Sequence, residues 1–359
     1  MVNNAVANER SDVTFLKDAI LTCATRSLEL DEATRIFDFL MKGKGDSIQI
    51  AAFLTALAMR GESVSEITAA TVMMRQYGHK ISAPKGAIDI VGTGGDGKGT
   101  LNISTAAMIV TAAAGVPVAK HGNRAATSQC GSADLLEACG VNLTRPPQDV
   151  ENILRDTGVA FMMAPIFHPA LKHIAPVRRL IGLQTVFNLL GPLTNPAEVD
   201  TLLIGVSDSK WQLPFAKVLQ NLERERAGCQ RAWIIHGHDG SDELSLSGEN
   251  QIVKLEKQKI STFTLHPEDA GFAPRVAKIA GEDATYNMQV FLGLLDGEQS
   301  DFRDSVVLNS AAALMVSCKV KNIMEGVEIS KETIDSKAAR ELFDTYIEAT
   351  NRVDTTDVY

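Results

Sequence analysis

A glycine-rich segment, Gly92–Gly97 (GTGGDG), follows the short apolar run 88–91 and is the first feature of the chain suited to chemistry. Glycines let backbone N–H groups converge on a phosphate because no Cβ stands in the way. The spacing also matches the dinucleotide-binding pattern G-x-G-x-x-G, which runs directly into a helix and has an acidic residue about 20 residues later. Here residues 98–102 intervene before any expected helix, and residues 117–124 contain no acid. The segment therefore favours a phosphate site over a nicotinamide site.

Two further segments are suited to binding phosphate. Asn102–Thr105 (NIST) opens an expected helix, whose free N–H groups and hydroxyls suit a second phosphate. Lys120–Arg124 (KHGNR) follows the next expected strand, with Lys120 as a point charge and Asn123 as both donor and acceptor. Ligands of open α/β sheets bind at the carboxyl ends of strands, so these segments are expected to share a polyphosphate site. The alternatives are a tight turn with an ordinary helix cap, and a solvated basic turn.

An acidic pair, Asp242 and Glu243, follows the expected strand 232–235. Adjacent carboxylates at a strand end hold Mg²⁺ directly or through water. Magnesium would offset the charge of a diphosphate and help it to leave. The alternative is a polar surface loop.

The elements that must position these residues predict an α/β fold with two parts. Residues 13–75 are expected to be helical, because apolar residues recur at helical spacing and Ser63 with Glu66 forms a capping box. From Pro84 onward, strands alternate with helices, which predicts a mainly parallel sheet. The expected strands are 88–91, 116–118, 160–163, 202–206 and 233–235.

A proline-rich stretch within 168–196 interrupts this alternation and is expected to cross between domains as a hinge. The small helical domain is assigned to 1–84, with 169–196 as its hinge contribution. The larger α/β domain is assigned to 85–168 and 197–359. Helices over 309–318 and 331–350 are expected to cover the sheet.

Composition narrows the functional classes. The chain has 359 residues, 45% of them hydrophobic, and a formal net charge of −9 without a basic stripe, so a nucleic-acid partner is not expected. Residues 1–12 are polar and lack the apolar core of a signal peptide, and no run of 18 apolar residues predicts a membrane span. The five scattered cysteines form no CxxC pair, which is typical of a reduced cytoplasmic protein.

Taken in order, the motifs closely resemble those of the anthranilate phosphoribosyltransferases, over about residues 13–350. The resemblance rests on the segments already quoted, on Gly131–Gly140, and on HPALKHIAPVRR and FNLLGPLTNP, which cover 168–179 and 187–196. It implies a fold related to the pyrimidine nucleoside phosphorylases, with hinge segments and a homodimer formed through the helical domains. It also implies transfer of a phosphoribosyl group from phosphoribosyl diphosphate (PRPP) to the amine of anthranilate, in tryptophan biosynthesis.

The resemblance further implies site residues. For PRPP they are Gly92, Thr93, Gly94, Gly95, Asp96, Thr100, Asn102, Ser104, Thr105, Lys120, Ser128, Gly131 and Ser132. For anthranilate they are Gly92, His121, Asn123, His168, Arg178 and Pro192. For Mg²⁺ they are Ser104, Asp242 and Glu243. Arg178 also fits on chemical grounds, because a guanidinium pairs with a carboxylate; the alternative is a solvated helix end.

The chain departs from the family pattern at two places. Residues 126–130 (ATSQC), with Gln129 and Cys130, stand where a serine-rich stretch with Lys or Arg is common, and Gln184 stands where Arg is usual. Both changes remove positive charge near the expected site.

Nothing in the sequence suggests a covalent nucleophile paired with a base, which fits direct displacement at the ribose C1. Two alternatives remain: phosphorolysis of pyrimidine nucleosides on the same fold, and a non-catalytic relative that binds nucleic acid. The Lys120–Arg124 loop and the acidic pair favour the transferase.

Overall fold

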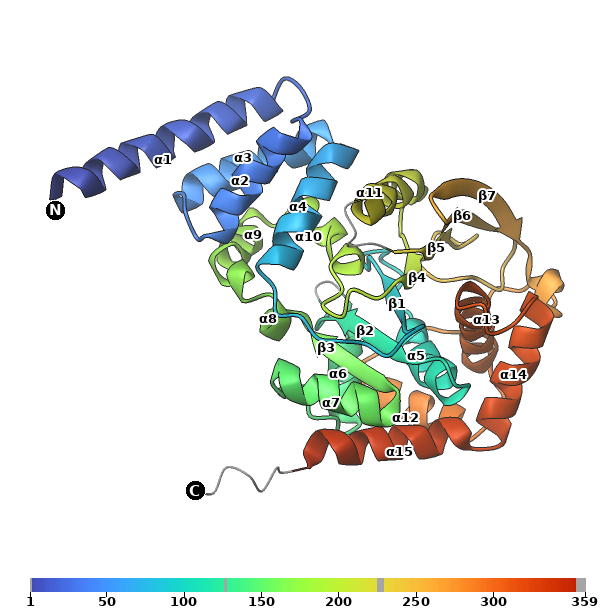
Figure 1. Ribbon diagram of the computed structural model, residues 1–359. Helices are drawn as coiled ribbons and strands as arrows, with labels where there is room; N and C mark the ends of the chain where they lie inside the picture. The colour runs from blue at the N-terminus through green and yellow to red at the C-terminus, as the bar shows by residue number, and fades with distance from the viewer. Residues whose placement is uncertain (1, 126–127, 225–228, 353–359) are drawn as a thin grey trace, which may run out of the picture.

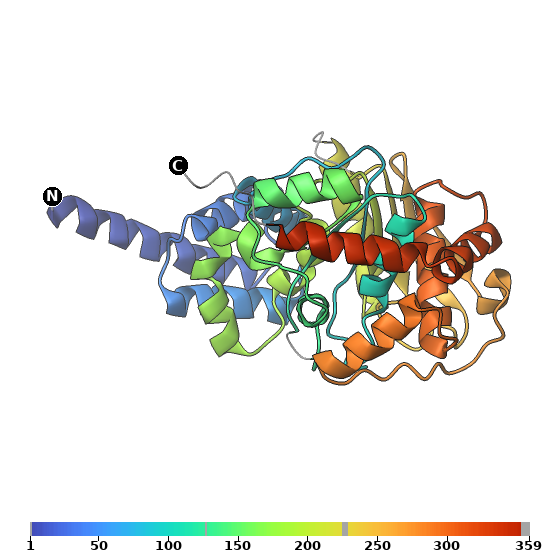
Figure 2. The same ribbon diagram turned by 90° about the horizontal axis from the view of Figure 1, so that it is seen from below.

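A helical lobe lies beside a larger lobe built on a sheet in the computed structural model, which describes residues 2–125, 128–224 and 229–352 (Figure 1). Both parts confirm the expected fold class. The helical lobe starts with four helices, and the capping box of Ser63 and Glu66 is present at the start of the fourth. The first helix begins well before residue 13 and projects away from the molecule (Figure 2). These helices are α1 (Val2–Cys23), α2 (Leu30–Met41), α3 (Ser47–Arg60) and α4 (Val64–Gln76).

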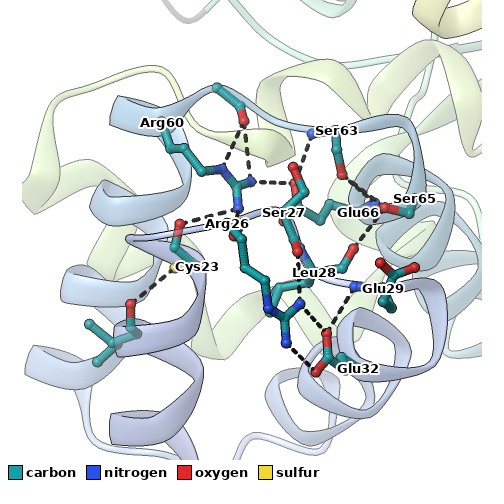
Figure 3. Close-up of polar contacts among 12 residues, drawn as sticks. Cys23, Arg26, Ser27, Leu28, Glu29, Glu32, Arg60, Ser63, Ser65 and Glu66 are labelled. Atoms are coloured by element: carbon teal, nitrogen blue, oxygen red, sulfur yellow. Dashed lines mark hydrogen bonds and ion pairs between the residues drawn. The ribbon is translucent and has the colours of Figure 1, made fainter.

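One buried carboxylate, Glu66, joins the ends of these four helices (Figure 3). It accepts hydrogen bonds from the backbone N–H groups of Leu28 and Ser63, both at 2.7 Å, and pairs with Arg60 at 2.5 Å. Arg60 in turn donates to the carbonyl of Cys23, the last residue of α1, and to that of Arg26 in the turn after it. Because these partners satisfy the carboxylate, its burial is tolerated. The same hydrogen bonds fix how the four helices meet.

The larger lobe contains a seven-stranded sheet in the order β3-β2-β1-β4-β5-β6-β7. The first five strands are parallel, as expected, and the last two form an antiparallel hairpin at one edge that the sequence did not suggest. The strands are β1 (Ile88–Gly92), β2 (Val118–Gly122), β3 (Val159–Met163), β4 (Thr201–Gly205), β5 (Arg231–His236), β6 (Asn250–Glu256) and β7 (Lys259–Leu265).

The expected strand at 116–118 was wrong in its bounds, since β2 begins at Val118. Pro117 has no N–H for the ladder, and only its carbonyl takes part, accepting from Ile88 N at 2.9 Å. Lys120 and His121 therefore lie within a strand and not in the loop after it.

Helices cover both faces of the sheet, and each face has its own apolar core. One face packs on helices that include α5 and α13, and the other packs on α11 and the helical lobe. The expected helix 331–350 is two helices, separated where Lys337 adopts a φ of 69°. The helices of this lobe are α5 (Ile103–Ala113), α6 (Ser132–Ala138), α7 (Pro147–Thr157), α11 (Gln212–Arg224), α12 (Ala284–Leu295), α13 (Asp301–Val316), α14 (Ile323–Asp335) and α15 (Ala338–Asn351).

The stretch expected as a hinge consists of short helices between β3 and β4. Its apolar residues join one continuous core that runs from the helical lobe to the sheet. The domain boundaries given above stay a prediction. The short helices are α8 (Ala164–Phe167), α9 (Ala175–Ile181) and α10 (Val186–Leu189), with 3₁₀ turns at Pro169–His173 and Gly191–Leu193.

Within the described residues, no helix is both long enough and apolar enough to cross a membrane.

Candidate active site

The carboxyl ends of β1 and β4 form the floor of the candidate site. Gly92 and Gly205 are register partners there, and a Cβ on either would overlap Asp242. The chain turns away in opposite directions from these two strands, since β2 follows β1 on one side and β5 follows β4 on the other. Such a switch point is where open α/β sheets bind ligands. The two glycines thus let the acidic pair reach this position.

The acidic pair lies against the two predicted phosphate segments. Asp242 Oδ2 accepts from Gly94 N at 2.7 Å, and Glu243 Oε1 accepts from Ser104 N at 3.1 Å. Burial, and then the charge of Asp96, raises the pKa of Asp242 to about 6. Burial, and then Asp242, raises the pKa of Glu243 to about 8. Two adjacent buried acids whose pKa values are both raised form a site that a cation would stabilise.

Ser104, Asp242 and Glu243 are therefore brought together as predicted for a metal site. No group of three or more His, Cys, Asp or Glu side chains suited to a metal occurs among the described residues. Mg²⁺ in phosphate-binding enzymes commonly uses one or two carboxylates together with water and substrate oxygens. The donors present fit that ion.

Lys120 is buried in the sheet, with 2% of its surface exposed. Its ammonium donates to the carbonyl of Ile90 on the neighbouring strand. Burial lowers its pKa, while the carboxylates of Asp89, Glu243 and Asp242 oppose that shift. The structure places this cation beneath the acidic pair and not on an open loop.

His121 and His168 form a second group on the opposite side of β2 from Lys120. Their rings meet edge to face, with centroids 5.0 Å apart, and both side chains are buried. Burial lowers the pKa of His121 to about 4 and that of His168 to about 3, so both are neutral at pH 7. The Nδ1 of His121 lies 2.9 Å from the carbonyl of Gly191, next to Pro192, which is also buried.

The start of α5 is fixed from two sides through Asn102. Its Nδ2 donates to Cys130 O at 3.1 Å, and its Oδ1 accepts from Asn287 Nδ2 at 3.0 Å. Thr105 is fully buried, and its hydroxyl has no hydrogen-bond partner among the described residues. Thr100 pairs with Ala280 in an isolated bridge that holds the preceding loop.

The loop after β2 is closed by Asp134 on α6. This carboxylate accepts from Ala125 N and Gly131 N at 2.9 and 2.8 Å. Arg124 pairs with Glu137 and Asp134 and so is not directed at the strand ends, whereas Asn123 is exposed. Ser128 and Ser132 flank the closure, and residues 126 and 127 of the departing segment lie outside the described residues.

Arg178 on α9 is half-buried and held in place. Its Nη2 donates to Asn188 Oδ1 at 3.2 Å, and its guanidinium lies 5.4 Å from the ring centre of Phe187. Burial lowers its pKa, although a guanidinium remains charged. An ordered cation on the helical lobe is suited to a carboxylate ligand.

Comparison with known proteins agrees with this geometry. The model of the glycosyl transferase family a/b domain matches residues 84–340, and the model of that family's helical bundle domain matches residues 20–78. Anthranilate phosphoribosyltransferase from Parvibaculum lavamentivorans is 47% identical over 91% of this chain and 94% of its own length. The chain belongs to the anthranilate phosphoribosyltransferase family.

Solved structures of this family share the fold. The enzyme from Thermus thermophilus is 41% identical, with a TM-score of 0.86 over 94% of this chain and 99% of its own. The enzyme from Saccharomyces cerevisiae, solved in complex with PRPP and Mg, is 25% identical, with a TM-score of 0.83 over 95% of this chain and 98% of its own.

Gln184, at the hinge, faces the glycine-rich loop. The Gln184 side-chain amide lies 3.2 Å from where a Cβ on Gly95 would stand. Thr93 Oγ1 accepts from the backbone N–H of Ser207, two residues after β4, at 3.2 Å. Asp96 accepts from Lys98 N at 3.0 Å, so its charge stays close to the loop.

Three residues of the site were missed from the sequence: Asp89, Asn195 and Gly205. Asp89 is an acid inside an apolar strand, and that mismatch was a usable signal. Asn195 and Gly205 carried none, because their importance depends on which segments meet in space.

Proposed function

We infer that this protein transfers the 5-phosphoribosyl group of PRPP to the amino group of anthranilate, giving N-(5-phosphoribosyl)anthranilate and diphosphate for tryptophan biosynthesis. One observation carries the proposal: backbone N–H groups of the glycine-rich loop and of the start of α5 donate to a buried acidic pair, at the switch point of the sheet. A substrate with two phosphate groups and a divalent cation matches that arrangement. The relatives bear the same activity in their names.

The PRPP side would be formed by residues on the α5 side of the sheet. Gly94 N and Ser104 N each donate to a carboxylate oxygen in this structure, which supports their use with a phosphate oxygen. Lys120 would add a positive charge beneath them. The remaining PRPP residues implied by the family resemblance belong to the same loops and helix starts, and we propose them as contacts.

The anthranilate side would be formed by residues that face the helical lobe. Neutral His121 and His168, with Pro192, would give an uncharged wall for a ring. Arg178 would bind the carboxylate of anthranilate, and Asn123 would contact it from the exposed loop.

Ser104, Asp242 and Glu243 would hold Mg²⁺, which supplies charge stabilisation to the departing diphosphate. In the reaction the anthranilate nitrogen forms a bond to C1 of the ribose as the bond from C1 to the diphosphate oxygen breaks. The nitrogen then loses a proton. Catalysis by this chain would consist of positioning both substrates and stabilising the leaving charge with backbone N–H groups.

We also propose a homodimer and a cytoplasmic location. Large apolar side chains are exposed on neighbouring helices α3 and α9, at Ile48, Met59 and Leu180. All five cysteines are free thiols, which suits a reducing compartment.

The test is the loss of anthranilate fluorescence on mixing the protein with PRPP and Mg²⁺. A loss that EDTA abolishes is expected. A folded protein that leaves the fluorescence unchanged, but releases free base from a pyrimidine nucleoside with phosphate, would overturn the proposal.

A further inference from the structure

The backbone pairing of β1 with β2 stops short of the candidate site. These strands are paired at Ile88 and Val118, whereas β1 and β4 stay in register from Ile88 and Thr201 to Gly92 and Gly205. Past the pairing point, side chains supply the bonds between β1 and β2. Lys120 donates to the carbonyl of Ile90, and His121 N donates to Asp89 Oδ1 at 3.2 Å.

The buried carboxylate of Asp89 is central to this arrangement. Its second oxygen, Oδ2, accepts from Asn195 Nδ2 at 2.7 Å. Asn195 also donates to Ala119 O at 2.8 Å, and its own Oδ1 accepts from Ala197 N at 2.8 Å. Each polar atom of the two side chains therefore has a defined role, and both residues are at most 2% exposed. A fully buried carboxylate is retained only where such partners satisfy it.

Alternation along the strands places this pair on the acceptor side. Asp89 shares a strand face with Val91, and His121 shares one with Ala119; both apolar residues belong to the core beneath the helical lobe. Lys120 points to the other face, where the acidic pair lies. Asp89 thus bonds directly to His121 on the anthranilate side, and it acts on Lys120 on the PRPP side only through its charge.

His121 is fixed at two points. Its backbone N–H is held by Asp89, and its ring by the carbonyl of Gly191. Because a carbonyl only accepts, Nδ1 carries the hydrogen and Nε2 is a bare acceptor. Nε2 is buried and has no hydrogen-bond partner among the described residues.

We propose that Asp89, together with Asn195, is a positioning residue for the anthranilate subsite, because it holds His121 and the end of the hinge segment in one place. The proposal rests on the proposed function. Asp89 touches neither substrate and acts through His121.

The principal test is Asp89→Asn. An amide at position 89 presents one N–H₂ group to donors that need acceptors, so His121 should shift. We expect the KM for anthranilate to rise about tenfold and the KM for PRPP to change less than about threefold. Phe343→Leu, in the core on the other side of the sheet, controls for lost stability. If Asp89→Asn changes both KM values equally, or neither, the proposal fails.

Exchanging the residues at positions 89 and 195 tests the pairing in a way that a general loss of stability cannot reproduce. Asn195→Asp alone brings two buried carboxylates together and should impair anthranilate binding more than Asp89→Asn does. Adding Asp89→Asn to Asn195→Asp should restore part of that loss. Additive losses would overturn the pairing. Should Asp89→Asn not fold, Asn195→Ala decides, since it removes the hydrogen bond that orients Asp89 and keeps the carboxylate; an unchanged KM for anthranilate would then overturn the proposal.

A spectroscopic readout separates this inference from the proposed function. The protein labelled with ¹⁵N-histidine has seven histidines, and His121→Gln assigns the backbone amide of His121. Asp89→Asn should move that amide resonance upfield, and Phe343→Leu should not. An unmoved resonance overturns the positioning role even in an active enzyme. If Asp89→Asn moves the resonance but the wild-type protein has no transferase activity, the structural role of Asp89 holds and only the proposed reaction is overturned.

Discussion

Glu243 owes its raised pKa to burial and to Asp242, and a bound cation would oppose both by favouring the charged carboxylate. We expect Glu243→Gln to lower kcat/KM on the order of 100-fold, because one charge that stabilises the cation on the leaving group is lost. Turnover measured against Mg²⁺ concentration tests this. The half-exposed acid Asp208, which pairs with Lys210, serves as control when changed to Asn and should leave the Mg²⁺ dependence intact. An equal effect of both changes would contradict a metal role.

Arg178 and Arg179 are adjacent on α9 and differ in their surroundings. Only Arg178 is ordered by Asn188 and Phe187. Arg178→Ala should raise the KM for anthranilate about 10- to 100-fold, the range expected for a lost charged hydrogen bond. The KM for PRPP should stay the same. Arg179→Ala is the matched control, and an unchanged KM for anthranilate in Arg178→Ala would remove Arg178 from the site.

His168 makes stability depend on pH. Its pKa is about 3 when folded, against about 6.5 when unfolded. Its contribution is therefore complete above pH 6.5 and is lost as pH falls towards 3. Between pH 7 and pH 5, the wild type should lose about 2 kcal/mol of unfolding free energy relative to His168→Gln. Urea unfolding of both proteins at pH 7, 6 and 5 measures this, and parallel pH profiles would refute it.

Among the elements, the junction of α1 to α4 depends on Glu66. Removing one partner of a buried charged network leaves the other charge uncompensated. Glu66→Ala should therefore cost about 3–5 kcal/mol of unfolding free energy. Asp156→Ala breaks the exposed pair with Arg155 and should cost less than about 1 kcal/mol. Similar losses in the two variants, measured by urea unfolding, would show that Glu66 has no special part.

The sequence predicted the helices and strands that local patterns determine, and it missed the elements that depend on contacts between distant segments. The capping box at Ser63 and the parallel strands were readable because periodicity and caps are local. The hairpin of β6 and β7 was missed, because charged and polar residues interrupt its apolar ones and obscure the strand pattern. The break at Lys337 was missed because a left-handed lysine has no sequence signal.

The candidate site shows the same division. Its loops were recognised from glycine and from charge order, and the structure brings Ser104 and the acidic pair together as predicted. The burial of Lys120 was not foreseen, because the strand β2 was placed too early in the chain. Asp89 and Asn195 are far apart in sequence, so only the fold reveals their pairing.

For the whole molecule, the exposed side chains of α3 and α9 predict self-association. Sedimentation should give a mass near twice the 38.6 kDa of the chain. A charge at Leu180, which is 88% exposed, should weaken the dimer because it would have to be buried there. Leu180→Asp therefore tests the surface, with Val276→Asp as a control at an equally exposed position on the larger lobe. A monomeric wild type would refute the dimer.

The carboxylates that bond to Gly94 N and Ser104 N have a consequence for selectivity among solutes. A free phosphate or sulfate ion must displace a competitor that is tethered in the same chain, and tethering gives that competitor a high effective concentration. A phosphate that is already bound to a divalent ion displaces the carboxylates at a lower cost in free energy, because the ion attracts them. We therefore expect the protein without substrate to bind free phosphate and sulfate weakly, and to bind phosphates complexed with a divalent metal more tightly.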